Sequence, residues 1–136
     1  MLRGGVRAML RRRRGKPPDR PVLDTAYLDR LAAHLGAQTV DELLADGLIE
    51  LCDRLERMEG LAAAGERETF LALMHDLTAI AGHLGLAELS ALAAQANREG
   101  RSDADAPLDA LAAPLTTAAP AALTALRDHL RYGQGG

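Results

Sequence analysis

Residues 70–84, FLALMHDLTAIAGHL, carry the pattern that decides the fold class. Apolar residues recur in this stretch at spacings of one, three and four: Phe70, Leu73, Met74, Leu77, Ile80, Ala81 and Leu84. At about 100° per residue, this pattern gathers them on one side of an α-helix. It therefore predicts a helix over residues 66–84 whose apolar side faces a core. His75 projects about 170° from the centre of that side, so we expect it to face solvent.

The outer side of this predicted helix is short of long charged residues around His75. Its neighbours there, one or two turns away, are Leu71, Ala72, Ala79 and Gly82. Exposed helix faces usually carry Lys, Glu and Arg, whereas this one is small and apolar. The pattern indicates a surface that a partner protein can approach closely.

Two further helices are predicted before this one. The first begins at Asp24 and ends at Gly36, because glycine commonly follows the last turn of a helix. The second begins at a capping box over residues 39–42 and ends near Gly65. Its apolar residues alternate at spacings of three and four, which favours a long helix that faces a bundle.

Three more helices are predicted after it. A fourth helix covers residues 87–97, and the polar residues 99–103 predict a turn. Pro107 suits the first turn of the next helix. Because proline is poorly tolerated inside a helix, Pro114 and Pro120 predict a short helix followed by a separate final one.

Composition favours helices throughout the chain. Of its 136 residues, 48% are hydrophobic and 2% aromatic, and Ala and Leu dominate, whereas strands prefer aromatic and β-branched residues. A chain of this length typically forms one domain. We therefore predict an all-α fold: an up-and-down four-helix bundle with an extra N-terminal helix over residues 22–132. We expect residues 1–21 to form a flexible basic tail and residues 133–136 to be disordered.

Charge is divided unevenly between the tail and the predicted bundle. Residues 1–21 hold eight Arg or Lys and one Asp, a net +7, so the total of −3 leaves −10 for residues 22–136. An acidic bundle should repel DNA, and any contact with nucleic acid is expected only through the tail.

Several function classes are not expected from this sequence. Cys52 is the only cysteine, so no intrachain disulfide can form and the cytoplasm is the expected compartment. No segment approaches about 20 uninterrupted apolar residues, so we expect no membrane span. The chain shows no glycine-rich phosphate loop and no Cys/His cluster, which predicts neither a metal site nor a nucleotide cofactor.

The segment 75–85, HDLTAIAGHLG, resembles the histidine phosphotransfer motif H-x-L-K-G-S-S-x-x-L-G. His75, Leu77, Leu84 and Gly85 match this motif of the histidine-containing phosphotransfer family, and the order of the helices is similar over residues 22–131. The resemblance implies a bacterial phosphorelay carrier without kinase activity of its own. His75 would accept the phosphoryl group. The face implied to dock a receiver domain consists of Leu71, Ala72, Thr78, Ala79, Gly82 and His83.

The resemblance also implies the partners and where the remaining chemistry resides. A response-regulator receiver domain would bring the Mg²⁺ and the aspartate that exchanges the phosphoryl group, and a hybrid or sensor histidine kinase would stand upstream. Histidine suits this role because its ring is nucleophilic near neutral pH.

Departures from the motif leave other functions open. Thr78 stands where the family has a lysine, and Ala79 where it has a glycine, so a cation that would help to hold the phosphoryl group is missing. One alternative is therefore an adaptor that docks a receiver or kinase without transferring phosphate. Another is a structural bundle that its arginine-rich tail tethers to nucleic acid or membrane.

The other three histidines have plainer interpretations. We expect His34 to pack at the boundary of the first helix, beside Tyr27 and Leu31. His83 lies eight residues after His75, about 80° round the helix, so the two cannot chelate a metal as an i, i+4 pair would. His129 falls near the end of the last helix and receives no role.

Overall fold

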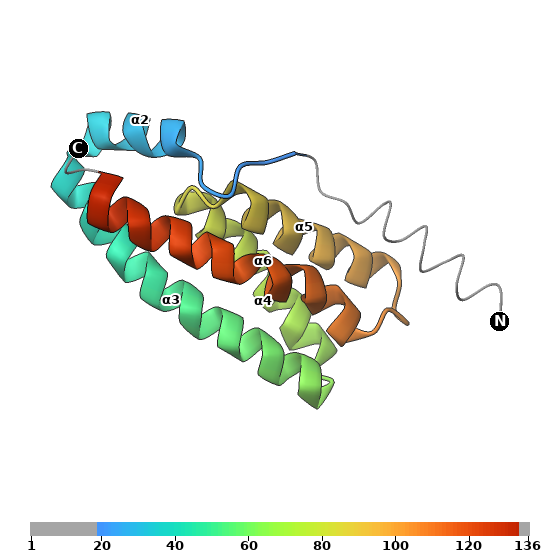
Figure 1. Cartoon of the computed structure of the whole chain (residues 1–136). Coiled ribbons are helices and arrows are strands. Elements are labelled where there is room, and N and C mark those ends of the chain that lie inside the picture. The colour runs from blue at the N-terminus through green and yellow to red at the C-terminus, as the bar shows by residue number, and fades with distance from the viewer. Residues whose placement is uncertain (1–18, 134–136) are drawn as a thin grey trace.

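The computed structural model describes residues 19–133, and this part of the chain is entirely helical (Figure 1). Its elements are α2 (Thr25–Leu35), α3 (Ala37–Ala64), α4 (Arg67–His83), α5 (Ala87–Ser102), α6 (Leu108–Asp128) and a π-helical turn, η1 (His129–Gly133). No strand occurs within residues 19–133, which confirms the predicted all-α class. Of the tails predicted over residues 1–21 and 133–136, residues 1–18 and 134–136 lie outside the described residues.

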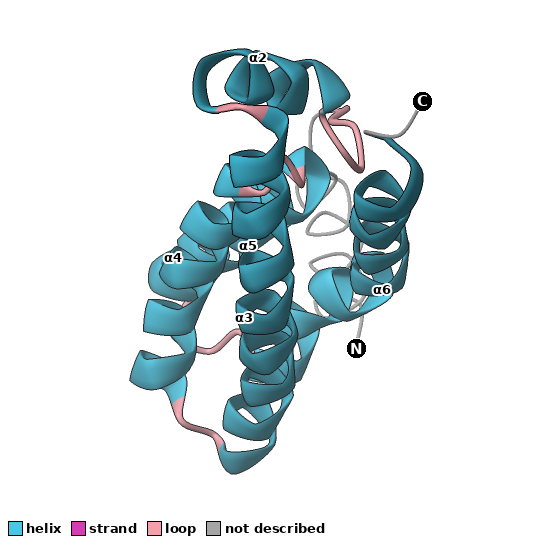
Figure 2. Cartoon of the chain, turned by 90° about the vertical axis from the view of Figure 1, so that its left-hand side faces the viewer, coloured by secondary structure: helices cyan, strands magenta, loops and turns pink. Residues whose placement is uncertain are grey.

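The four longest helices enclose one apolar core. Helix α4 packs against α3 and α5, and α6 contacts the same two helices, so the four close a ring of contacts (Figure 2). The predicted apolar side of α4 is confirmed, because Phe70, Met74 and Leu77 are completely buried. Ile80 alone of that set is only partly buried.

Helix α2 begins where we predicted and caps one end of the molecule (Figure 1). The Asp24 side chain accepts a hydrogen bond from the backbone N–H of Tyr27 at 3.1 Å, which satisfies a free donor of the first turn. Leu28 is completely buried. Gly85, in the turn after α4, has φ +77° and packs so closely on Leu28 that a Cβ atom there would come within 3.2 Å of it.

Two predicted helix boundaries were wrong, and glycine explains both. Helix α3 begins at Ala37 after Gly36, whose φ of +88° reverses the chain at once, so the expected capping box over residues 39–42 lies inside the helix. Helix α5 continues to Ser102 through the turn expected at residues 99–103. Gly100 is a packing residue there, because a Cβ atom at that position would collide with Leu71 and crowd Leu111.

The prediction that Pro114 and Pro120 divide the last helix was also wrong. Helix α6 runs unbroken through both, and both side chains are exposed. The carbonyls that lose a partner belong to the residues four positions earlier, Ala110 and Thr116, which are exposed as well, so water can hydrogen-bond to them. Buried residues on the opposite side keep the helix in place: Leu111, Leu115, Ala119, Ala122 and Leu126.

Arg67, the first residue of α4, joins α4 to the end of α5. Its guanidinium donates hydrogen bonds to the backbone carbonyls of Ala106 at 2.7 Å, Gly100 at 2.8 Å and Asp103 at 2.6 Å. Carbonyls in the last turn of a helix lack partners within the helix. Arg67 supplies a hydrogen bond to one of these carbonyls, that of Gly100. The sequence pattern gave no sign of this role.

Candidate functional site

His75 lies midway along α4 with its side chain exposed, as we predicted. Ala72, Ala79 and His83 are also exposed, whereas Thr78 and Gly82 are half-buried. Helical spacing places Ala72, Ala79 and Gly82 within about 60° of His75 around the helix axis. The structure therefore presents the histidine among small side chains.

Leu71 does not belong to this exposed face, which corrects our expectation. Its side chain is 2% exposed and forms part of the core. Helix α5 packs closely on this side of α4 at the buried Gly100, where a Cβ atom would collide with the Leu71 side chain. The periodicity of one helix cannot show where a neighbouring helix covers its flank.

The face around His75 is also more acidic than we expected. Asp76 is exposed next to it, and Glu68 is exposed seven residues earlier, at nearly the same angle around α4 and about 10 Å along the axis. Within residues 19–133, no group of three His, Cys, Asp or Glu side chains is placed to hold a metal ion.

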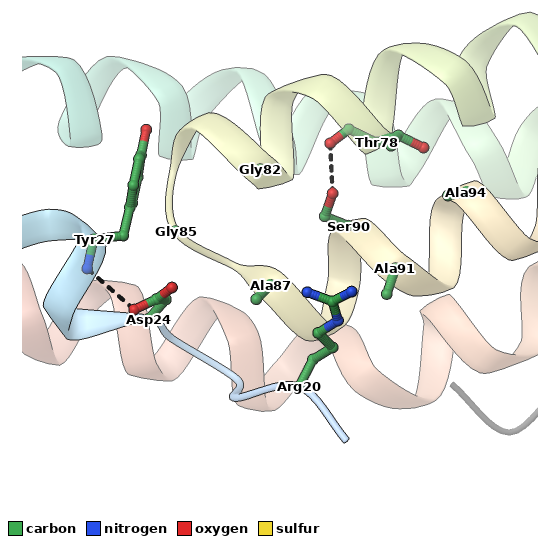
Figure 3. A pocket seen from close by; sticks show the side chains of 10 residues that line it. All are labelled: Arg20, Asp24, Tyr27, Thr78, Gly82, Gly85, Ala87, Ser90, Ala91 and Ala94. Carbon is green, nitrogen blue, oxygen red and sulfur yellow. Dashed lines mark hydrogen bonds between the residues drawn. The ribbon is translucent and has the colours of Figure 1, made fainter. Parts of the chain in front are cut away.

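A pocket of about 300 Å³ opens beside this face (Figure 3). Thr78 and Gly82, three and seven residues after His75, form its α4 side, and His75 itself is not among the lining residues. Small side chains of α5 form the opposite side, together with Ser90. Arg20 and Tyr27 contribute from the segment before α2 and from α2 itself.

Two hydroxyl groups in the pocket are already engaged in hydrogen bonds. The Thr78 hydroxyl donates to the Met74 carbonyl at 2.8 Å, within α4. The Ser90 hydroxyl donates to the backbone carbonyl of Thr78 at 2.7 Å and so links α5 to α4 (Figure 3). Neither hydroxyl hydrogen is directed at the open pocket.

Backbone hydrogen bonds hold the segment before α2 against the turn between α4 and α5. The N–H of Asp24 donates to the Gly85 carbonyl at 2.7 Å, and the N–H of Glu88 donates to the Pro21 carbonyl at 3.0 Å. The Tyr27 hydroxyl adds a bond to the His83 carbonyl at 3.1 Å. Pro21, the last residue of the predicted basic tail, is therefore hydrogen-bonded through its backbone to α5.

The remaining histidines differ from expectation. His34 is exposed, so the boundary packing predicted for it was wrong, because α2 packs through Leu28 on another side. His129, to which we gave no role, is only 9% exposed. Its Nε2 atom is buried without a hydrogen-bond partner in the part of the chain that the structure describes. His129 lies three residues after the buried Leu126, so it continues the spacing of three and four of the buried side of α6 into the π-helical turn.

Comparisons with protein-family models, with curated proteins and with solved structures found no match to this chain. Of the helices that the structure describes, none is both long and apolar enough to cross a membrane.

Proposed function

We propose that this chain is a histidine phosphotransfer protein of a bacterial, cytoplasmic phosphorelay, built on an up-and-down four-helix bundle with α2 as the extra N-terminal helix. His75 would carry a phosphoryl group between aspartates of receiver domains. The observation that carries this proposal is an exposed histidine in the middle of α4, surrounded by small side chains.

The residues that match the motif have surroundings that suit this proposal. Leu77 and Leu84 are buried and fix α4 in the core, which determines the direction in which His75 projects. Gly85 has a left-handed backbone conformation and little room for a side chain. These positions would therefore keep the phosphoacceptor on a rigid element at the surface, as efficient group transfer requires.

In the proposed transfer, a neutral ring nitrogen of His75 attacks the phosphorus of an aspartyl phosphate. The nitrogen–phosphorus bond forms as the phosphorus–oxygen bond breaks, and the aspartate leaves as a carboxylate. The other ring nitrogen keeps its proton, so the phosphorylated ring carries a positive charge. The receiver supplies Mg²⁺ to offset the charge on the phosphoryl oxygens. The same steps in reverse pass the group to a second receiver.

The proposed docking face consists of Ala72, Ala79 and Gly82 around His75, with Thr78 and His83 at its edge. Small side chains let a receiver bring its aspartate to within contact distance of the imidazole, because long side chains would hold the two backbones apart. Leu71 is left out of this face, since it is buried.

Phosphate capture from a receiver tests this proposal. The purified chain is mixed with radiolabelled phospho-receivers from the same genome, and the label on the chain is tested for stability in acid and alkali. We expect acid-labile, alkali-stable label that is lost in His75→Gln and kept in His34→Gln, a control at an exposed histidine on α2. Absence of label with every receiver would contradict the proposal.

The alternative is an adaptor that docks a receiver without accepting phosphate, and Thr78 favours it. Its hydroxyl is bonded within α4, so it offers no cation and no free donor in place of the family's lysine. Receiver binding that survives His75→Ala, with no label captured, would support the adaptor, because the affinity would then come from the small-residue face.

A further inference from the structure

The proposed transfer site needs a donor for the phosphoryl oxygens, and α4 does not offer one. Three nonbridging oxygens carry the negative charge during transfer, and nearby cations stabilise it. Thr78 donates its hydroxyl hydrogen to Met74, and Ser90 donates its own to Thr78. The charged neighbours of His75 along α4, Glu68 and Asp76, are acidic.

Arg20 is the one cationic side chain among the described residues that line the pocket beside His75. Figure 3 shows it extending from the segment before α2 toward Ser90 and Ala91, on the α5 side of the pocket. No hydrogen bond or ion pair engages its guanidinium within residues 19–133. A cation with no such partner among the described residues can bind an incoming anion.

The backbone next to Arg20 is fixed, which gives its side chain a defined origin. Pro21 is bonded to Glu88 at the start of α5, and Asp24 is bonded to Gly85 at the end of α4. The opposite side of the pocket is formed by Thr78, which is one turn, about 4.5 Å along the axis, from His75. Arg20 therefore lines the same pocket as Thr78, the position from which the motif's lysine would extend.

We propose that Arg20 replaces the lysine that the motif lacks and binds the phosphoryl group on His75 from across the pocket. This inference rests on the proposed function. A guanidinium presents paired N–H donors that match two phosphoryl oxygens, so it suits this role as well as an ammonium does. The departure at Thr78 would then be compensated by a residue from a different part of the chain.

Labelling with phosphoramidate tests Arg20 without any receiver. A nitrogen of His75 attacks the phosphorus, the bond from phosphorus to the ammonium group breaks, and ammonia leaves. At low salt, we expect Arg20→Ala to slow labelling of His75 about fivefold, the upper range for an exposed ion pair. Adding Thr78→Lys to this variant should restore the rate. Arg30→Ala, at an exposed position on α2, is the matched control, and His34 provides an internal reference for labelling.

Each outcome separates this inference from the proposed function. Equal rates at His75 with and without Arg20, or no labelling of His75 while His34 is labelled, would overturn the inference. If labelling by phosphoramidate depends on Arg20 but no receiver transfers phosphate to His75, the inference stands and the proposed function fails. If receivers transfer phosphate and Arg20→Ala changes neither rate, the function stands and the inference fails.

Discussion

The four histidines differ mainly in their surroundings. His34, His75 and His83 are exposed, but only His75 lies at the centre of a face of small side chains. His129 is buried at the junction of α6 and η1, with one ring nitrogen lacking a partner among the described residues. Because His75 is exposed, it can react with another protein. The buried ring nitrogen of His129 instead destabilises the folded chain.

We expect His129→Phe to raise the free energy of unfolding by about 1 kcal/mol. A buried polar atom without a hydrogen bond is destabilising, and phenylalanine has a similar shape without that atom. Urea denaturation monitored by circular dichroism measures the change. His34→Phe, at an exposed position, should alter stability by less than about 0.5 kcal/mol. A clear loss of stability in His129→Phe would mean that the ring nitrogen has a partner in solution.

Sequence reasoning predicted the exposure of His75 correctly, but it did not predict which residues of other segments lie near it. Exposure of His75 followed from the periodicity of α4 alone. Burial of Leu71 depends on how closely α5 packs, and the position of Arg20 depends on backbone bonds that Pro21 and Asp24 make to the α4–α5 turn. Contacts between segments distant in sequence leave no periodic pattern, so one sequence could not predict them.

Among the helices, α3 contains two glycines in contrasting surroundings. A Cβ atom at Gly60 would meet nothing within 4 Å, whereas at Gly47 it would collide with the buried side chain of Leu84. Gly47 therefore permits the close approach of α3 to the end of α4, the helix that carries His75. Gly60 provides no such packing benefit.

The same substitution should therefore have opposite effects at these two positions. Gly60→Ala should stabilise the protein by about 0.5–1 kcal/mol, because alanine loses less backbone entropy in a helix. Gly47→Ala should destabilise it by about 1 kcal/mol, because the strain of overpacking exceeds that gain. Chemical denaturation of both variants measures the difference. Equal shifts of the same sign would show that α3 and α4 are not so close at Gly47.

Helix existence could be predicted from the sequence more readily than helix ends. Apolar spacing predicted α3 and α4 because each of these helices buries one side. Pro114 and Pro120 were misread because the rule against proline inside a helix assumes that the freed carbonyls lack other partners, and here they face solvent. The prediction of a turn at Gly100 was wrong because this glycine lies inside α5, where its missing side chain leaves room for Leu71 and Leu111 of the neighbouring helices.

For the molecule as a whole, the proposed docking face lies on α4 and leaves the exposed side of α6 free. We expect Ala79→Arg to slow transfer from a phospho-receiver by about tenfold or more, because a long side chain next to His75 would obstruct the receiver. Labelling by phosphoramidate should persist in this variant, since the small donor needs no docking. Ala113→Arg, at an exposed position of α6, is the control. Equal transfer rates in the two variants would place the docking face elsewhere.

The most direct test of phosphotransfer is the lifetime of a receiver's aspartyl phosphate in the presence of the chain. We predict that the wild-type chain shortens this lifetime and that the lost phosphate appears on His75, whereas His75→Gln leaves the lifetime unchanged. A receiver that binds the chain but keeps its phosphate equally long with the wild type and the variant would contradict the relay and establish an adaptor.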